Sequence, residues 1–318
     1  MKTIYNILSF NAIAFAIAML AVSCYKEAPL TPDLDEPQYV INDSDDPAQH
    51  YIYTFMKETG IYILSSYSDV DYKWNVYDES NYSIERMEPD MLDESVEYVK
   101  TVLTDVYDRE FAKKYLPFKI LLAGRIDDTM SYSDDGTDMV CGYGRSYLAI
   151  GQLRSDILPA KSQTQILSDL GKINGMLWGN FIYTNNLITI PEGFFSPSQQ
   201  YYETNIKSLI VDGDQEAAIR SLGMWFYGKE PDSYYAMAPD AAGDVAGFIQ
   251  MILTHTAEEM QAEMTGYDVL LVKYNALISA VKAACGIDLQ ELGEANVAKF
   301  GSLETEQGES GGETEGQE

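Results

Sequence analysis

The sequence predicts an α+β fold, with a small mixed sheet in the N-terminal half and a mainly helical C-terminal half. Short apolar runs bounded by glycine, which are typical of buried strands, occur before about residue 160. After that position, apolar residues recur with helical spacing. The chain has 318 residues, of which 46% are hydrophobic, so it can bury a proper core.

The first half mixes helices and strands. Asp46 precedes an apolar pattern of helical period and is placed to cap the helix. A glycine opens the next apolar run, which favours a strand. The expected elements are helices over 46–59 and 89–108 and strands over 60–68, 118–124 and 145–153.

The second half is expected to consist of successive helices. The first of these, "SQTQILSDLGKINGMLWGNFIYT", is a long apolar candidate. The expected helices cover 162–184, 214–228, 241–264, 266–286 and 287–300.

Four segments follow from the composition along the chain. Residues 1–23 are expected to be a lipoprotein signal peptide, and residues 24–47 a lipidated cysteine with a flexible, proline- and aspartate-rich tether. Residues 48–300 are expected to form one domain. Residues 301–318 contain six glutamates and no basic residue, which predicts an acidic disordered tail.

The N-terminal segment carries the clearest functional signal. Lys2 supplies a thin positive region, residues 12–22 are apolar, and "LAVSC" places small residues before Cys24. This pattern is typical of a lipoprotein signal, in which Cys24 becomes the acylated N-terminus. An ordinary cleaved signal peptide and an uncleaved anchor are the alternatives. The acidic stretch after Cys24 favours an outer-membrane location, facing the periplasm or the cell surface.

The charge of the chain excludes one class of partner and limits another. Acidic residues outnumber basic residues 50 to 21, giving a net charge of -29, which would repel nucleic acid. An acidic surface gains nothing from anionic lipids, so membrane affinity is expected to come from acyl chains on Cys24. The 24 tyrosines suit a surface that binds peptides, glycans or other proteins, although ordinary half-buried packing is the simpler explanation.

The residues alone give no complete catalytic constellation. The chain has two histidines, His50 and His255. His255 precedes Glu258 and Glu259 at helical spacing, which could suit a metal, but no further ligands stand at usable spacing. A structural helix histidine is the simpler interpretation. Cys141 and Cys285 belong to an exported chain and could form a disulfide.

The stretch "GMLWG" places Gly175 and Gly179 one helical turn apart in an apolar helix. A glycine inside a helix costs roughly 1 kcal/mol relative to alanine, so the pair needs a reason. One explanation is that the glycines allow another helix or a ligand to approach closely. The other is that different side chains once stood there.

The order of "HYIYTFMKETGIYILSSYSDVDYKW", a long central helix, "AGDVAGFIQMIL" and "LLVKYNALISAVKAACGIDLQEL" resembles the predicted zinc-binding metallopeptidase lipoproteins of Bacteroidetes, a gluzincin-like family. The resemblance covers about 48–295 and implies a zincin-like domain. In that family a central helix carries His-Glu-x-x-His, whose histidines hold zinc while the glutamate activates water.

The resemblance implies where the lost motif would lie. Gly175 and Gly179 would occupy the histidine positions and Met176 the glutamate position. In the later helix, "GDVAG" would replace the acidic motif, with Gly247 at a former ligand position and Asp244 the one acidic residue left. The other expected cleft residues are Trp178, Asn180 and Gly243. No catalytic or metal-binding residue is then expected, and no cofactor, although the family binds zinc.

These observations predict a membrane-anchored, non-catalytic relative of the metallopeptidases that binds a peptide or a glycan in the retained cleft. One alternative is an active exported metallopeptidase whose ligands lie elsewhere, for example around His255 and Glu259. Another is an accessory lipoprotein of a nutrient-uptake complex.

Overall fold

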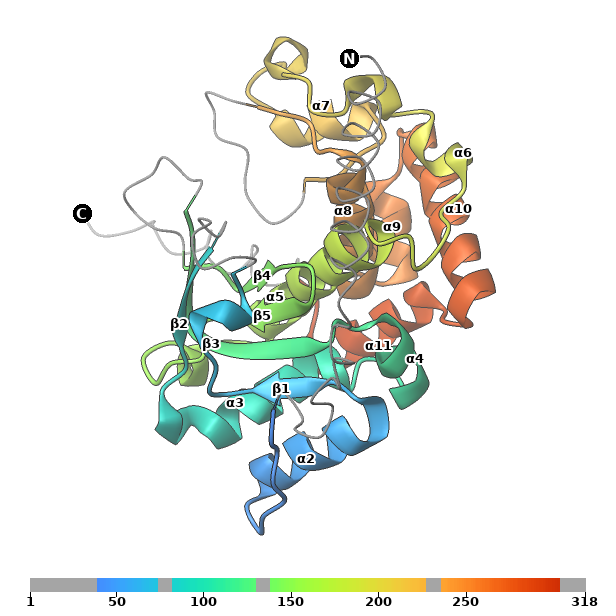
Figure 1. Cartoon of the computed structure of the whole chain (residues 1–318). Helices are drawn as coiled ribbons and strands as arrows, with labels where there is room; N and C mark the ends of the chain where they lie inside the picture. The colour runs from blue at the N-terminus through green and yellow to red at the C-terminus, as the bar shows by residue number, and fades with distance from the viewer. Residues whose placement is uncertain (1–38, 74–81, 130–137, 227–235, 304–318) are drawn as a thin grey trace, which may run out of the picture. The chain divides into compact units, whose positions relative to one another are not determined.

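The computed structural model describes residues 39–73, 82–129, 138–226 and 236–303. The chain divides into a unit that ends at Val40 and a unit that begins at Ile41. The expected signal peptide, Cys24 and most of the tether lie outside the described residues, as does the expected tail from residue 304 onward. The architecture below is that of the unit from Ile41 (Figure 1).

The first helix begins and ends as its sequence predicts. Helix α2 (Pro47–Thr59) has Asp46 as its N-cap, and the Asp46 carboxylate accepts a hydrogen bond from Gln49 N at 2.8 Å. Gly60 ends the helix with a φ of 78°, a left-handed conformation that glycine adopts without strain. The short strand β1 (Tyr62–Leu64) follows directly.

A mixed sheet is built around one long strand, β3. The strands are β1, β2 (Tyr82–Arg86), β3 (Lys119–Asp128), β4 (Cys141–Tyr143) and β5 (Tyr147–Ile150). Their order is β1-β3-β5-β4, with β2 also pairing with β3. Strands β1 and β5 run parallel to β3, β2 runs antiparallel to it, and β4 runs antiparallel to β5. The small mixed sheet of the N-terminal half is therefore confirmed.

The expected helix over 89–108 is divided into three parts. A 3-10 turn, η2 (Pro89–Met91), leads into α3 (Leu92–Val99), which continues as a π-helical turn, η3 (Lys100–Thr104). Helix α4 (Arg109–Tyr115) follows, with Asp108 as its N-cap. A further 3-10 turn, η1 (Asp69–Asp71), lies after β1.

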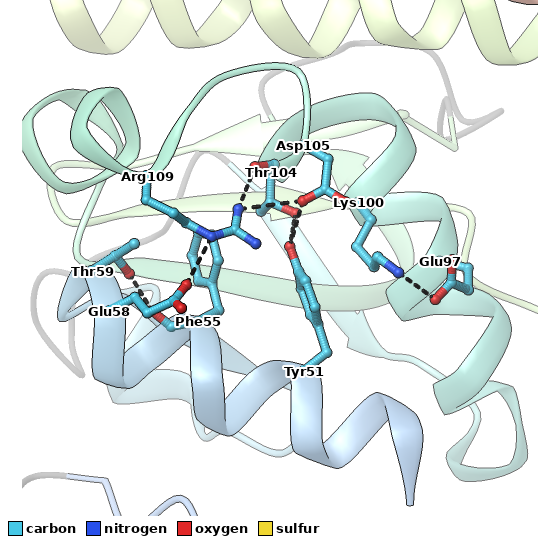
Figure 2. A network of polar contacts seen from close by, with 9 residues as sticks. All are labelled: Tyr51, Phe55, Glu58, Thr59, Glu97, Lys100, Thr104, Asp105 and Arg109. Atoms are coloured by element: carbon cyan, nitrogen blue, oxygen red, sulfur yellow. Dashed lines mark hydrogen bonds and ion pairs between the residues drawn. The ribbon is translucent and has the colours of Figure 1, made fainter.

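A polar network joins α2 to η3 and α4 (Figure 2). The Tyr51 hydroxyl lies 2.7 Å from Thr104 Oγ1 and donates to Asp105 Oδ1 at 3.0 Å. Burial raises the pKa of Tyr51 to about 12. Arg109 donates to Glu58 and to the carbonyl of Thr104, and its guanidinium covers the Phe55 ring at 4.8 Å. These groups satisfy one another, so the network is structural.

The remainder is mainly helical, as expected. Its elements are η4 (Leu158–Ala160), α5 (Gln163–Met176), η5 (Leu177–Tyr183), α6 (Glu192–Phe195), η6 (Gln199–Tyr201), η7 (Lys207–Leu209), α7 (Gln215–Ser221), α8 (Ala241–Thr254), α9 (Ala257–Glu263), α10 (Asp268–Cys285) and α11 (Leu289–Phe300). Of these, η5 is π-helical and η4, η6 and η7 are 3-10 turns.

The expected helix over 241–264 is two helices. His255 ends α8 in an extended conformation, and Thr256 begins α9 with a capping box in which Glu259 bonds back to Thr256 N. The chain therefore breaks between α8 and α9 at His255 and Thr256. Helices α10 and α11 match the expected segments closely. Helix α10 ends at its C-cap Gly286, and α11 begins after its N-cap Asp288.

The main core lies between the sheet and the helices. Strand β3 contributes Ile120 and Leu122, and α5 and α8 contribute apolar side chains that are also fully buried. A smaller apolar cluster surrounds Ile219 of α7. Within the described ranges, no single helix is long and apolar enough to cross a bilayer; α10 and α11 meet that criterion only as a pair, bent by 99°.

Candidate functional site

Helix α5 and its continuation η5 carry the glycine stretch. Ser162 caps α5 through a capping box with Gln165, which fixes where the helix begins. Gly175 and Met176 are the last buried residues of α5, whereas Gly179 lies in the π-helical η5. The stretch therefore spans a change in helix type, a feature that often accompanies functional sites.

Gly179 lies directly against α8. A Cβ atom at Gly179 would be 2.2 Å from the carbonyl oxygen of Ala242 and 2.9 Å from Cβ of Ala246. No real Cβ atom tolerates such distances from backbone, so only glycine fits while the two helices hold this separation. This contact matches the close approach that the sequence left open as one explanation.

A second glycine that the sequence analysis missed meets the same helix. A Cβ at Gly171 would lie 2.6 Å from Thr254 Cγ2 and 3.3 Å from the carbonyl of Gln250. Gly171 and Gly179 thus contact opposite ends of α8, and Figure 1 shows the two helices side by side. The spacing "GKINGMLWG", with glycine at every fourth residue from 171 to 179, was the available signal.

The residues at the positions implied by the resemblance do not fit zinc. Gly175 and Gly179 offer no side-chain donor, and Met176 is a buried core residue, 6% exposed. Gly247 faces a different neighbour from Gly179, because its Cβ would lie 2.8 Å from the carbonyl of Trp225. Across the described ranges, no three His, Cys, Asp or Glu residues are grouped so that they could hold a metal ion.

The other expected cleft residues have varied surroundings. Trp178 is 1% exposed, and its indole N–H donates to the Tyr107 hydroxyl at 2.9 Å, so it is part of the core. Asn180 is half-buried, and its Oδ1 has no hydrogen-bond partner. Gly243 is half-buried in the first turn of α8, and its N–H donates to the N-cap carboxylate of Asp240 at 2.7 Å.

Asp244 belongs to a buried polar cluster rather than to an exposed site. Its Oδ2 lies 2.5 Å from Lys273 Nζ of α10, and both side chains have 0% exposure. The Tyr202 hydroxyl donates to the same oxygen at 2.6 Å. Lys273 also donates to Ser198 Oγ at 2.8 Å, and Ser198 donates to the carbonyl of Leu222 at 2.7 Å. We call these four residues, Ser198, Tyr202, Asp244 and Lys273, the Asp244 cluster.

Burial governs the electrostatics of the Asp244 cluster. Desolvation raises the pKa of Asp244 to about 6, although the Lys273 charge and the hydrogen bonds from Lys273 and Tyr202 act in the opposite direction. Desolvation lowers the pKa of Lys273, against the attraction of Asp244. Burial, followed by the Asp244 charge, raises the pKa of Tyr202. Asp244 Oδ1 has no hydrogen-bond partner, which adds to the cost of keeping the carboxylate charged.

Lys273, Tyr202 and Ser198 were not singled out from the sequence. Lys273 lies in an apolar helical run, "DVLLVKYNALISAVK", where a lysine on the buried face is itself an unusual residue. Its partner stands 29 residues earlier. The sequence could have indicated that Lys273 is buried, but no pattern in the sequence links it to a partner 29 residues away.

The alternative metal residues are occupied by structural contacts. His255 Nδ1 lies 2.9 Å from the carbonyl of Met251, and the side chain is 8% exposed. Glu259 accepts hydrogen bonds from Thr256 N and Ser302 Oγ. His50 is an exposed residue of α2 whose Nδ1 lies 2.7 Å from Asp43 Oδ1. Cys141 and Cys285 do not form a disulfide with each other.

Replacing Gly179 with alanine is expected to destabilise the protein, because the new methyl group must displace the backbone of α8. Overpacking typically costs about 1–3 kcal/mol, and because the clash here is with backbone we expect the upper part of that range, which exceeds the roughly 1 kcal/mol that alanine gains over glycine in a helix. Urea unfolding measures the change. The matched control is Gly193→Ala in α6, where a Cβ meets nothing within 4 Å and stability should be unchanged or higher. Equal stability of Gly179→Ala and wild type would contradict the close contact.

Replacing Lys273 with methionine should destabilise the protein more at pH 8 than at pH 5. Without Lys273, the pKa of Asp244 rises further, because the lysine charge is what lowers it. In the folded variant the Asp244 carboxyl then binds its proton more tightly than in the unfolded chain. The stabilisation that this proton binding gives is present at low pH and is lost as the pH rises through the folded-state pKa of Asp244. Breaking a buried pair costs about 3–5 kcal/mol when the carboxylate stays charged.

The measurement is the unfolding free energy of Lys273→Met and wild type at both pH values. Lys282→Met is the control on the same helix, since Lys282 pairs with Asp288 at the surface and should matter little at either pH. A destabilisation by Lys273→Met that is independent of pH would show that Asp244 does not titrate in this range.

Comparison with known proteins finds similarity in structure rather than in sequence. No family model and no curated protein matches the chain. The fold is similar to the crystal structure of a "putative zinc-binding metallo-peptidase from Bacteroides caccae", with a TM-score of 0.53 and 15% sequence identity. The match covers 84% of this chain and 97% of the other. The chain therefore has an α+β fold similar to that of this solved structure.

Proposed function

We propose that this chain is a membrane-anchored lipoprotein that has the fold of a zinc metallopeptidase without its hydrolytic chemistry, and that it binds a peptide or a glycan. The fold similarity supports a peptidase-like framework. The lost motif, the anchor and the ligand are parts of the proposal.

One observation carries the loss of catalysis. The resemblance assigns the position of Gly179 to a zinc-binding histidine. Gly179 lies against the backbone of α8, so close that a Cβ atom there would be 2.2 Å from the carbonyl oxygen of Ala242. A histidine there would require the two helices to separate. A zinc hydrolase needs side chains that hold the metal and activate its water, and neither Gly175, Met176 nor Gly179 supplies one.

As part of the proposal, we place an extended peptide at the end of the sheet. Strand β4 is the last strand of the path β1-β3-β5-β4 in the described part of the chain; Cys141 and Gly142 in it are buried, and it contacts both α5 and η5. An extended peptide can add to such an edge through main-chain hydrogen bonds. The glycan alternative rests on tyrosine content alone.

The N-terminal sequence supports the proposed anchor. Signal cleavage before Cys24 would leave an acylated cysteine followed by the tether to residue 47, with the domain held away from the membrane. The acidic segment after Cys24 supports an outer-membrane location. An accessory role beside a nutrient-uptake complex is compatible with the same anchor, and an active peptidase with displaced ligands is the competing proposal.

Metal content tests the proposed loss of catalysis. The chain from residue 25 onward, purified without chelator, exposed to zinc and desalted, is expected to retain no stoichiometric zinc by mass spectrometry and to cleave no peptide library. A screen of the same sample should retain extended peptides rather than glycans. Zinc at close to one per chain would overturn the proposal and direct attention to His255, Glu259 and His50.

Labelling tests the proposed anchor. The full chain, expressed in a Gram-negative host with labelled palmitate, should incorporate the label and partition into detergent, because Cys24 accepts the acyl chains. Cys24→Ser should abolish both, whereas Cys285→Ser should change neither. Label that persists in Cys24→Ser, or a wild-type chain released in soluble form, would contradict lipidation at this cysteine.

A further inference from the structure

The Asp244 cluster brings an amine and a carboxyl group together where water is excluded. We propose that Lys273 and Asp244 condense to an intramolecular isopeptide bond that links α10 to α8. The bond would join Lys273 Nζ to Asp244 Cγ. This inference is independent of the proposed anchor and ligand.

The geometry of the pair is the first argument. Lys273 Nζ lies 2.5 Å from Asp244 Oδ2, so the nitrogen is already in contact with the carboxyl group that it would attack. Both side chains are fully buried. The nitrogen also lies 4.7 Å from the ring centre of Phe194 and 5.2 Å from that of Phe248. Aromatic rings around the pair keep out the water that would otherwise stabilise its separate charges.

Two other buried lysine–aspartate pairs are less close or less enclosed. Lys119 Nζ is 3.6 Å from the Asp71 carboxylate and donates to the Asp71 backbone carbonyl at 2.6 Å. Lys161 contacts Asp169 at 2.6 Å in a similar set of polar contacts, with Gln152 beside the lysine and Tyr98 donating to the aspartate, but its two side chains retain some exposure, at 8% and 7%. The Lys273 pair combines complete burial with the shortest contact of the three.

Burial shifts both groups in the direction of the neutral forms that the reaction needs. Burial lowers the pKa of Lys273 and raises that of Asp244, so the two values move toward each other. A neutral amine has the free lone pair that attack requires, and a neutral carboxylic acid is a better acceptor than a carboxylate. An isolated pair in water would remain ionised at neutral pH.

The condensation balances without a further reactant. A proton passes from the ammonium group to the carboxylate, which gives an amine and a carboxylic acid. The nitrogen lone pair then forms the C–N bond to Cγ, the C–O bond to Oδ2 breaks, and Oδ2 leaves as water with one proton from the nitrogen. No atom is oxidised or reduced.

Two neighbours act as positioning residues. The Tyr202 hydroxyl donates to Oδ2, the oxygen that departs, and so polarises the carboxyl group and assists its loss. Ser198 Oγ accepts a hydrogen bond from Lys273 Nζ and holds the amine beside Asp244. The hydroxyl of Ser198 is itself fixed by its bond to the carbonyl of Leu222.

The tryptic map of the denatured full chain tests the bond directly. No lysine or arginine stands between residues 230 and 273, so trypsin should release 230–273 and "YNALISAVK", residues 274–282, from an unlinked chain. Acylation of Nζ blocks cleavage after Lys273. The expected product is therefore 230–282, lighter by one water than the linear peptide. Release of 274–282 in full yield overturns the proposal.

Two variants distinguish the cross-linked peptide from a linear peptide that trypsin has failed to cut after residue 273. Lys273→Met should give a linear 230–282 peptide with no loss of water. Asp244→Asn should condense with loss of ammonia instead, giving the same cross-linked 230–282 mass as wild type. A linear peptide 230–282 in the wild type, with its water retained, would count against the bond.

A third pair of variants tests the positioning role. Tyr202→Phe should lose most of the cross-linked fraction in freshly folded protein, whereas Tyr201→Phe, its neighbour in sequence, should retain it. Because the fraction of cross-linked peptide is measured in folded chain, loss of the fold in Tyr202→Phe would not by itself lower it. An unchanged fraction in Tyr202→Phe overturns the role assigned to that hydroxyl.

Discussion

The backbone contact between α8 and the α5–η5 helix is the constraint on which the helical half depends. Gly171 and Gly179 bring the two helices close at both ends of α8. A third glycine, Gly293 of α11, lies against the Ile252 carbonyl of the same helix, where a Cβ would be 2.0 Å away. Because α8 is approached this closely from two helices, its position fixes those of α5 and α11 together. Side chains at these three positions would push the helices apart.

The Asp244 cluster fixes α8 from another direction. Lys273 lies on α10, Tyr202 follows η6, and Ser198 precedes it, so one carboxylate gathers segments that are distant in sequence. A buried charge is stabilising only when its partners remain in place, and removing one partner leaves the full cost of desolvation. The cluster therefore favours one arrangement of α8, α10 and the η6 segment, whether its pair is ionic or covalent.

These two features bear on the relation between fold and activity. The chain shares its fold with a protein described as a metallopeptidase, but a fold does not carry chemistry without its side chains. At Gly179 the space that a histidine would need is filled by α8 backbone. In the later helix, Asp244 forms a buried ion pair with Lys273. Under the proposed function, packing takes the place that a metal site would need, and binding is the role that remains.

The sequence by itself determined the fold class and where several helices begin. Asp46, Ser162 and Asp288 cap helices where they stand, because capping is a hydrogen bond between residues three apart. The signal "TAEE" at 256–259 was also local, and it could have revealed the break between α8 and α9. Strands β2 and β4 were not foreseen, since short strands owe their existence to partners elsewhere in the chain.

Only the tertiary structure decided what the candidate residues contact. The sequence identified Gly175 and Gly179 as a helical pair but could not show that Gly179 meets Ala242, nor that Trp178 is buried against Tyr107. The sequence likewise identified Asp244 as a candidate residue but did not identify Lys273 as its partner. The physical reason is the same in each case: periodicity and capping act within a few residues, whereas burial, close helix contacts and ion pairs join residues whose separation along the chain carries no pattern.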